Sequence, residues 1–174
     1  MRKPSWFSSE FSATRSAVLF AVSLALILSS TAAPCQQLTV QPDTGKPVVF
    51  SRSDLEELPT VDVTTADHSG TAVKFTGVSL KSVLEKAGVT FGESLKGKRL
   101  ASCLLVEAAD GYRAVIALPE LDPAFSDKQI LLVFQRNGRP LDEKEGPYRI
   151  VIPDEKRMAR WVRQATTLKI VAVE

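Results

Sequence analysis

Four cations crowd a short stretch near the C-terminal end of the sequence. They are Lys156, Arg157, Arg160 and Arg163. All four fall within eight residues, directly after an apolar run that ends at Pro153. We expect a short helix here, in which Arg157, Arg160 and, less well, Arg163 share one face. A strand that runs into cations on a helix suits an anion-binding site, and the alternative is a solvated basic face.

The elements that position these cations are predicted from the flanking residues. Residues 148–152 form an apolar run typical of a buried strand, and residues 167–173 predict a closing strand. Trp161 and Val162 lie between the last two arginines, so we expect them to turn inward. Val151 and Leu132 are then expected as core residues of their strands.

Other residue types with useful chemistry are sparse. His68 is the only histidine, which excludes a multi-histidine metal site, and it is expected in an exposed turn. Three carboxylates, Asp142, Glu143 and Glu145, crowd one loop and are expected to be solvated rather than set as an acid–base pair. The sequence contains no glycine-rich nucleotide loop, no HExxH motif and no GxSxG motif.

The two cysteines, Cys35 and Cys103, form no CxxC motif. An exported chain allows them to oxidise together. However, Cys103 lies in a strand-like apolar run, so we expect a buried, inert thiol there instead.

The N-terminal region has the pattern of a secretory signal peptide. Basic residues precede an uncharged apolar run at 17–28, and small residues follow it. Cleavage after Ala32 fits best, because Ser30 and Ala32 then occupy the small-residue positions. We therefore expect a signal peptide at 1–32 and a single domain at 33–174, exported to the periplasm or secreted, with no stable membrane span after cleavage. A lipoprotein at Cys35 is disfavoured by Pro34, and an uncleaved anchor is the remaining alternative.

Charge argues against a nucleic-acid binder. The full chain has 22 Lys+Arg and 20 Asp+Glu, and residues 1–32 carry three of those cations and one of those anions. The mature chain is then formally neutral, with 19 of each. A neutral domain with one short basic cluster lacks the broad basic surface that nucleic-acid binding requires.

The pattern along the chain predicts an α+β fold with a mostly antiparallel or mixed sheet and short helices. Two hairpins are expected, at 61–75 and at 100–118, the second around Asp110-Gly111. Leu80, Val83, Leu84 and Ala87 indicate an amphipathic helix. A shorter helix is expected at 51–58, with a capping box from Ser53 to Glu56.

Three blocks of sequence, in this order and spacing, resemble the oxidoreductase molybdopterin-binding domain, the fold of sulfite oxidase and its bacterial relatives. The first is FTGVSLKSVLEKAGV at 75–89. The second is ADGY at 109–112, followed by Leu118, Leu121 and Asp122. The third joins LLVF at 131–134, NGRPL at 137–141, GPYRIVIP at 146–153 and ARWVR at 159–163.

The resemblance implies a pterin cofactor, molybdopterin, or another small anionic ligand. Arg160 and Arg163 match the family segment that contacts the cofactor's phosphate and pterin, and Lys156 and Arg157 lie beside it. Catalytic members also hold molybdenum through a cysteine, in a segment that corresponds to 61–70 here. That segment contains no cysteine, and we do not expect Cys103, one block later, to replace it.

Two hypotheses follow from this departure. One is an exported member of the family that binds a pterin or other anion, with sulfite-oxidase-type catalysis in doubt. The other is a cofactor-free domain that keeps the fold as a binding or interaction module, with a protein partner that the sequence does not reveal.

Overall fold

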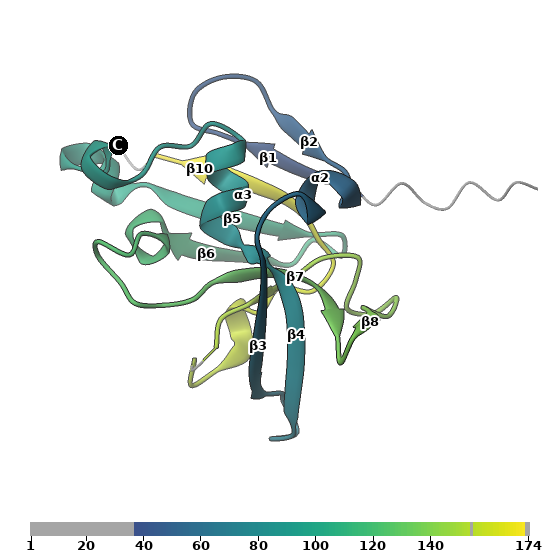
Figure 1. Ribbon diagram of the computed structural model, residues 1–174. Helices are drawn as coiled ribbons and strands as arrows, with labels where there is room; N and C mark the ends of the chain where they lie inside the picture. The colour runs from purple at the N-terminus through teal and green to yellow at the C-terminus, as the bar shows by residue number, and fades with distance from the viewer. Residues whose placement is uncertain (1–36, 154, 173–174) are drawn as a thin grey trace, which may run out of the picture. The chain divides into compact units, whose positions relative to one another are not determined.

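Two five-stranded β-sheets organise the described part of the chain (Figure 1). The computed structural model describes residues 37–153 and 155–172. These residues belong to one compact unit. The predicted signal peptide, its cleavage site and Cys35 lie outside the described residues.

The first sheet has the strand order β2-β1-β10-β5-β6. Its strands are β1 (Leu38–Gln41), β2 (Val48–Phe50), β5 (Cys103–Ala108), β6 (Arg113–Ala117) and β10 (Ala165–Val171). Strands β1 and β10 pair in parallel and the other neighbours are antiparallel, so the sheet is mixed. Burial alternates along β5 and β6, as a sheet with one face on the core requires.

The second sheet has the order β3-β4-β7-β8, and β9 pairs with β7. Its strands are β3 (Thr60–Ala66), β4 (Ala72–Ser79), β7 (Leu131–Arg136), β8 (Arg139–Pro140) and β9 (Arg149–Val151). The β4–β7 register shifts at Thr76/Gly77. A Cβ at Gly77 would lie 2.3 Å from the carbonyl oxygen of Leu132, so only glycine allows the two backbones to approach this closely.

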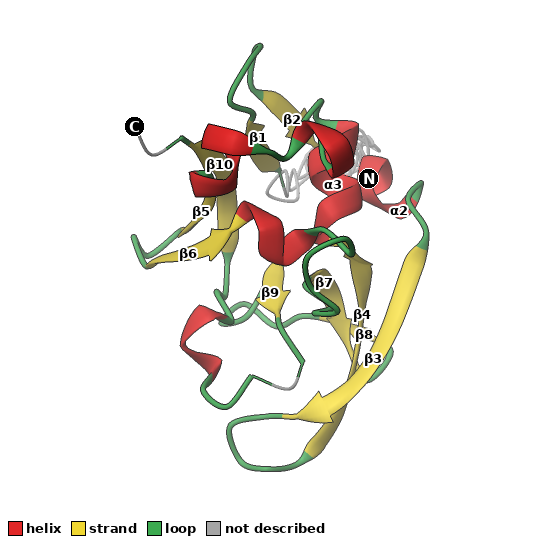
Figure 2. Cartoon of the chain, turned by 90° about the vertical axis from the view of Figure 1, so that its left-hand side faces the viewer, coloured by secondary structure: helices red, strands yellow, loops and turns green. Residues whose placement is uncertain are grey.

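The helices are short and connect the strands (Figure 2). The α-helices are α2 (Arg52–Glu56) and α3 (Leu80–Lys86), and the 3-10 helices are η1 (Gly92–Ser94), η2 (Gly97–Ala101), η3 (Leu118–Leu121) and η4 (Met158–Arg160). Helix α3 buries Leu80, Val83 and Leu84, as its periodicity predicts. It ends before Gly88, whose φ of 93° suits a glycine. Among the described residues, no helix is long and apolar enough to cross a membrane.

Most of the predicted elements are confirmed, including both hairpins. The α+β class with a mixed, mostly antiparallel strand arrangement is also confirmed. The predicted capping box is wrong in position: the cap is Ser51, which exchanges hydrogen bonds with Asp54. The helix lies within the predicted range 51–58 but is shorter, at Arg52–Glu56, and Ser51 rather than Ser53 caps it because its side chain accepts from the N–H of Asp54.

Candidate functional site

The basic segment follows β9, and its local structure differs from the predicted helix. Only η4 is helical, and the chain is irregular at Trp161 and Val162. The reason is that the carbonyl of Val162 accepts a hydrogen bond from the N–H of Ile150, 2.8 Å away, which holds this stretch beside β9. The arginines therefore do not share one helical face.

Trp161 anchors the segment to the core. It is 4% exposed, and its indole Nε1 donates to the carbonyl oxygen of Ile152 at 2.9 Å. Its ring meets Phe75 of β4 edge to face, with centroids 6.0 Å apart. Val162, Val151 and Leu132 are also buried, so the predicted core positions of all four are confirmed.

Arg160 is held by carboxylates. Its Nη1 lies 3.0 Å from Glu120 Oε1, and its Nε donates to Glu155 Oε1 at 2.8 Å. The hydrogen bond to Glu120 is the main cause of a raised pKa for Arg160, against the opposing effect of burial. Any anion at Arg160 would have to displace one of these carboxylates.

Lys128 completes this group by an ion pair to Glu120 at 2.6 Å. We call Glu120, Lys128, Glu155 and Arg160 the rim cluster. Partial burial of Glu120 favours its neutral form, but hydrogen bonds from Arg160 and Lys128 outweigh it and lower its pKa to about 2.

Arg163 lies in a different place, at a hollow of about 200 Å³. The lining residues are His68, Asp110, Tyr112, Ala159, Trp161 and Arg163. The hydroxyl of Tyr112 donates to the carbonyl oxygen of Ala159 at 2.6 Å and so ties the β5–β6 turn to η4. Arg113, next along, pairs with Glu107 instead and is not part of the hollow.

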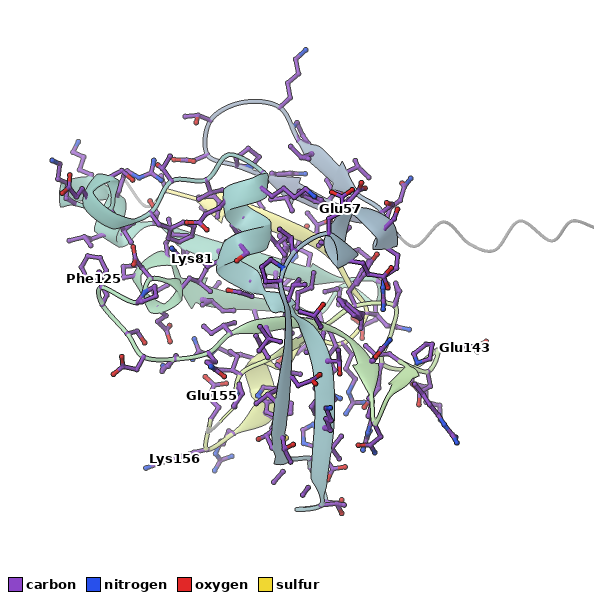
Figure 3. All side chains as sticks on the ribbon, in the orientation of Figure 1. Glu57, Lys81, Phe125, Glu143, Glu155 and Lys156 are labelled. Atoms are coloured by element: carbon purple, nitrogen blue, oxygen red, sulfur yellow. The ribbon has the colours of Figure 1, made fainter. Side chains whose placement is uncertain are left out.

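Lys156 and Arg157 are exposed and do not line this hollow. Figure 3 shows Lys156 projecting outward next to Glu155. The structure thus divides the four predicted site residues: Arg160 joins the rim cluster, Arg163 joins the hollow, and the other two face solvent. A role of these cations in cofactor binding stays a prediction.

A second hollow, of about 480 Å³, lies between β3 and residues 152–155. Two carboxylates, Asp127 and Glu155, line it beside a single cation, Lys128. That balance opposes an anion, whereas the smaller hollow at Arg163 has one cation, Arg163, and one carboxylate, Asp110.

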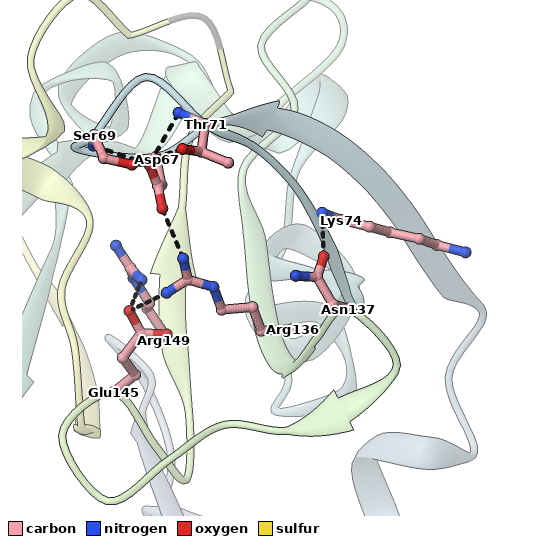
Figure 4. Close-up of polar contacts among 8 residues, drawn as sticks. All are labelled: Asp67, Ser69, Thr71, Lys74, Arg136, Asn137, Glu145 and Arg149. Atoms are coloured by element: carbon pink, nitrogen blue, oxygen red, sulfur yellow. Dashed lines mark hydrogen bonds and ion pairs between the residues drawn. The ribbon is translucent and has the colours of Figure 1, made fainter.

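Sequence reasoning missed a buried charged group, which Figure 4 shows. Arg149 of β9 is 1% exposed, and its Nη1 donates to Glu145 Oε1 at 2.6 Å. The prediction that Glu145 is solvated is wrong: the residue is 9% exposed, because the loop folds its carboxylate onto Arg149. The available signal was a charged residue in the middle of the apolar strand at 148–152.

Arg136 extends this group to the tip of the β3–β4 hairpin (Figure 4). Its two terminal nitrogens lie 3.1 Å from Glu145 Oε1 and 2.6 Å from Asp67 Oδ2. Hydrogen bonds from Ser69, more than the charge of Arg136, lower the pKa of Asp67. We call Asp67, Arg136, Glu145 and Arg149 the buried cluster.

Arg149 keeps unused hydrogen-bonding capacity. Its Nε and Nη2 are buried and have no hydrogen-bond partner among the described residues. Its guanidinium carbon lies 5.4 Å from the ring centroids of both Phe75 and Trp161. Burial lowers its pKa and the charge of Glu145 opposes that effect. Trp161 also lines the hollow at Arg163, whereas Arg149 does not line it.

The described residues do not form a metal-binding site. Among residues 37–153 and 155–172, no group of three or more His, Cys, Asp or Glu side chains is placed to hold a metal ion. Residues 61–70 form the β3–β4 hairpin, and Cys103 lies on β5 in the other sheet. The expected burial of Cys103 is wrong. Its side chain is half-exposed because it lies on the outward face of β5, whereas the next residue, Leu104, points into the core.

The fold is that of a molybdopterin-binding domain of the sulfite oxidase type. The family model for the oxidoreductase molybdopterin binding domain matches residues 31–173, so the chain belongs to that family. No curated protein matches the chain.

A solved structure supports the fold. The chain is similar to the sulfane dehydrogenase SoxCD from Paracoccus pantotrophus, with a TM-score of 0.61 and 22% sequence identity. The match covers 80% of this chain and only 39% of that chain. At this identity the likeness shows a shared fold, and the activity of the larger protein is not carried over with it.

Proposed function

We propose that this chain is an exported ligand-binding member of the family, which holds a small anion, such as the phosphate end of a pterin cofactor, in the hollow at Arg163. The observation that carries this proposal is the buried guanidinium of Arg149. Its guanidinium carbon lies 5.4 Å from the ring centroid of Trp161, two of its nitrogens have no hydrogen-bond partner among the described residues, and Arg163 lines the hollow together with Trp161. A guanidinium suits this role because its planar fork binds phosphate or sulfonate oxygens at two points.

The size of the hollow limits what binds. A volume of about 200 Å³ is below the roughly 300–1,000 Å³ typical of pockets for drug-sized ligands. The residues therefore fit a phosphate-sized group better than a whole molybdopterin. Tyr112 and Trp161 supply the aromatic surface beside that group.

Catalysis of the sulfite oxidase type is not part of this proposal. The segment at 61–70 contains no cysteine, and a soft thiolate is the ligand that such a metal centre needs. If molybdopterin binds, its phosphate would contact Arg163, and the cofactor would supply redox chemistry only with a metal ligand from elsewhere.

The first test is anion binding by calorimetry at low salt, with inorganic phosphate and a pterin phosphate as probes. We expect Arg163→Ala to weaken binding by about tenfold to a hundredfold, since a hydrogen bond to a charged group contributes about 1.5–3 kcal/mol. The matched control is Arg139→Gln, an exposed arginine on β8 that does not line the hollow. Equal binding by wild type and Arg163→Ala would contradict the proposal.

A second candidate function is a cofactor-free interaction module. It is favoured by the carboxylates that already occupy Arg160 and the Nη1 of Arg149. Metal analysis of protein purified from a molybdenum-replete host separates the two classes. Stoichiometric molybdenum that is lost in Cys103→Ser would make Cys103 the metal ligand and restore the enzyme hypothesis.

A further inference from the structure

Strand β3 forms a margin of the second sheet and pairs only with β4 (Figure 2). No backbone hydrogen bond reaches its other side from the described residues. The strand is seven residues long, and its residues are exposed or half-buried throughout. It therefore presents a long row of unpaired backbone groups, which at Val63 and Thr64 borders the hollow of about 480 Å³ described above.

The pairing with β4 decides which backbone groups point outward. The N–H of Asp67 donates to the carbonyl oxygen of Thr71 at 2.9 Å. Hydrogen-bonded pairs alternate along an antiparallel ladder, so residues 65, 63 and 61 also bond to β4. The N–H and C=O groups of Thr60, Asp62, Thr64 and Ala66 consequently face the open side.

The other edge strands are protected against pairing with a further strand. Strand β2 has three residues and follows Pro47, and β8 has two residues and contains Pro140. Strand β6 borders η4, and β9 is capped on its outer side by the Ile150–Val162 hydrogen bond. Strand β3 also follows a proline, Pro59, but it is seven residues long, has no proline within it and has no bulge against β4. Natural sheets rarely leave so long a margin unprotected unless it pairs with something.

We propose that two copies of this chain pair antiparallel through β3 and form a two-fold symmetric dimer. The proposal does not depend on the anion site. With Val63 on the symmetry axis, Thr60 lies opposite Ala66 of the second copy and Asp62 lies opposite its Thr64. This register uses all four outward-facing residues on each strand. A two-fold interface requires such self-complementarity, and β3 has it.

Charge disfavours the neighbouring register that is centred on Asp62. A shift by one pair would place Asp62 opposite its own copy, and directly opposed like charges destabilise a sheet. In the proposed register each Asp62 faces a threonine and keeps its ion pair with Lys74, which is 2.8 Å long. On the other face, Val63 meets Val63 and Val61 meets Thr65, so half-buried side chains cover one another.

The antiparallel arrangement also separates the two bodies. Thr60 lies at the base of the hairpin, opposite Val78, and Ala66 lies next to the turn at its tip. The base of each hairpin therefore meets the tip of the other, and the two copies extend away from the joint in opposite directions. A second copy is thus the occupant that fits this margin.

Sedimentation velocity of the purified protein, from low micromolar to about 1 mM, tests the proposal. We expect a monomer–dimer equilibrium that Thr64→Pro weakens at least tenfold, because the proline removes an outward N–H and leaves the β4 ladder intact. Asp62→Lys should also weaken it, by placing two lysines from each copy around the joint. The matched control, Val49→Lys on the margin strand β2, should dimerise as wild type does.

A charge exchange tests the register itself. In Asp62→Lys combined with Thr64→Asp, each lysine faces an aspartate of the second copy, so dimerisation should return at least to half of its wild-type strength. Circular dichroism and urea unfolding confirm that each variant is folded. The proposal is overturned if wild type stays monomeric at about 1 mM. It is also overturned if the β3 variants leave the dimer dissociation constant unchanged, or if β3 pairs only with an added strand peptide.

Discussion

The buried cluster and the rim cluster contain the same chemical groups but lie in different environments. Each links arginine to shared carboxylates across long separations in sequence. The central pair of the buried cluster, Arg149 and Glu145, is 1% and 11% exposed, although Arg136 at its edge is 34% exposed. In the rim cluster the side chains of Arg160 and Glu120 are 27% and 24% exposed. Water solvates the rim charges, but the buried charges depend on one another.

This difference determines what each cluster contributes. An ion pair at the surface is worth about 0–1 kcal/mol, because water competes with it. Breaking a buried pair strands a charge in a medium that cannot solvate it, which costs several kcal/mol. Yet replacing such a pair by apolar residues is often neutral, so the buried cluster is not needed for stability alone.

The largest expected effect is at Trp161, whose ring packs against Arg149 of the buried cluster and which follows Arg160 of the rim cluster in sequence. Trp161→Ala should lower the free energy of unfolding by about 3–5 kcal/mol through the cavity it leaves. Urea unfolding measures this, with Phe125→Ala as the control. Phe125 is 51% exposed, so its loss should change stability by less than about 0.5 kcal/mol. An unchanged midpoint for Trp161→Ala would place this residue at the surface.

The comparison of the clusters is tested most directly at Glu145. Glu145→Gln should cost about 3–5 kcal/mol in urea unfolding, because it leaves Arg149 buried without a charge partner. Arg149→Met should cost less, because Glu145 keeps its ion pair with Arg136 at 3.1 Å and is not left without a charge partner. Glu143→Gln, an exposed neighbour in the same loop, is the control. Equal losses in Glu145→Gln and Glu143→Gln would mean that the buried cluster behaves like the rim.

The rim cluster should show its contribution in a pH titration. The pKa of Glu120 falls from 4.5 to about 2 on folding, so its stabilisation is fully present above about pH 4.5. It is lost as pH falls from there to about 2, where the folded protein also takes up the proton. After allowance for solvent exposure we expect about 1 kcal/mol. The measurement is the difference in unfolding free energy between wild type and Glu120→Gln at pH 6 and pH 2.5. A difference that persists undiminished at low pH would contradict this assignment.

The smallest effect is expected at Lys128, whose side chain is 48% exposed. Lys128→Gln should change the free energy of unfolding by about 0.2–1 kcal/mol, and salt should reduce the change further. Unfolding at low and high salt checks both points. A loss as large as that of Glu145→Gln would erase the distinction between the two clusters.

The sequence alone determined the local structure of this protein. Alternating apolar residues identified the strands, Asp110-Gly111 located a tight hairpin, and Gly88 marked the end of α3. The order and spacing of the three blocks identified the family. These features follow from interactions between residues close in sequence, or from a pattern repeated along the chain, and both can be read without coordinates.

Only the tertiary structure decided the partners of the charges. Arg160 was grouped with Arg163 by spacing, but Glu120, forty residues away in sequence, neutralises it. Glu145 was expected in water, but the loop folds it onto Arg149, and Asp67 reaches Arg136 across 69 residues. The physical reason is that an ion pair depends on which strands become neighbours and in what register. Sheet order is set by the packing of the whole core, and no local stretch of sequence contains it.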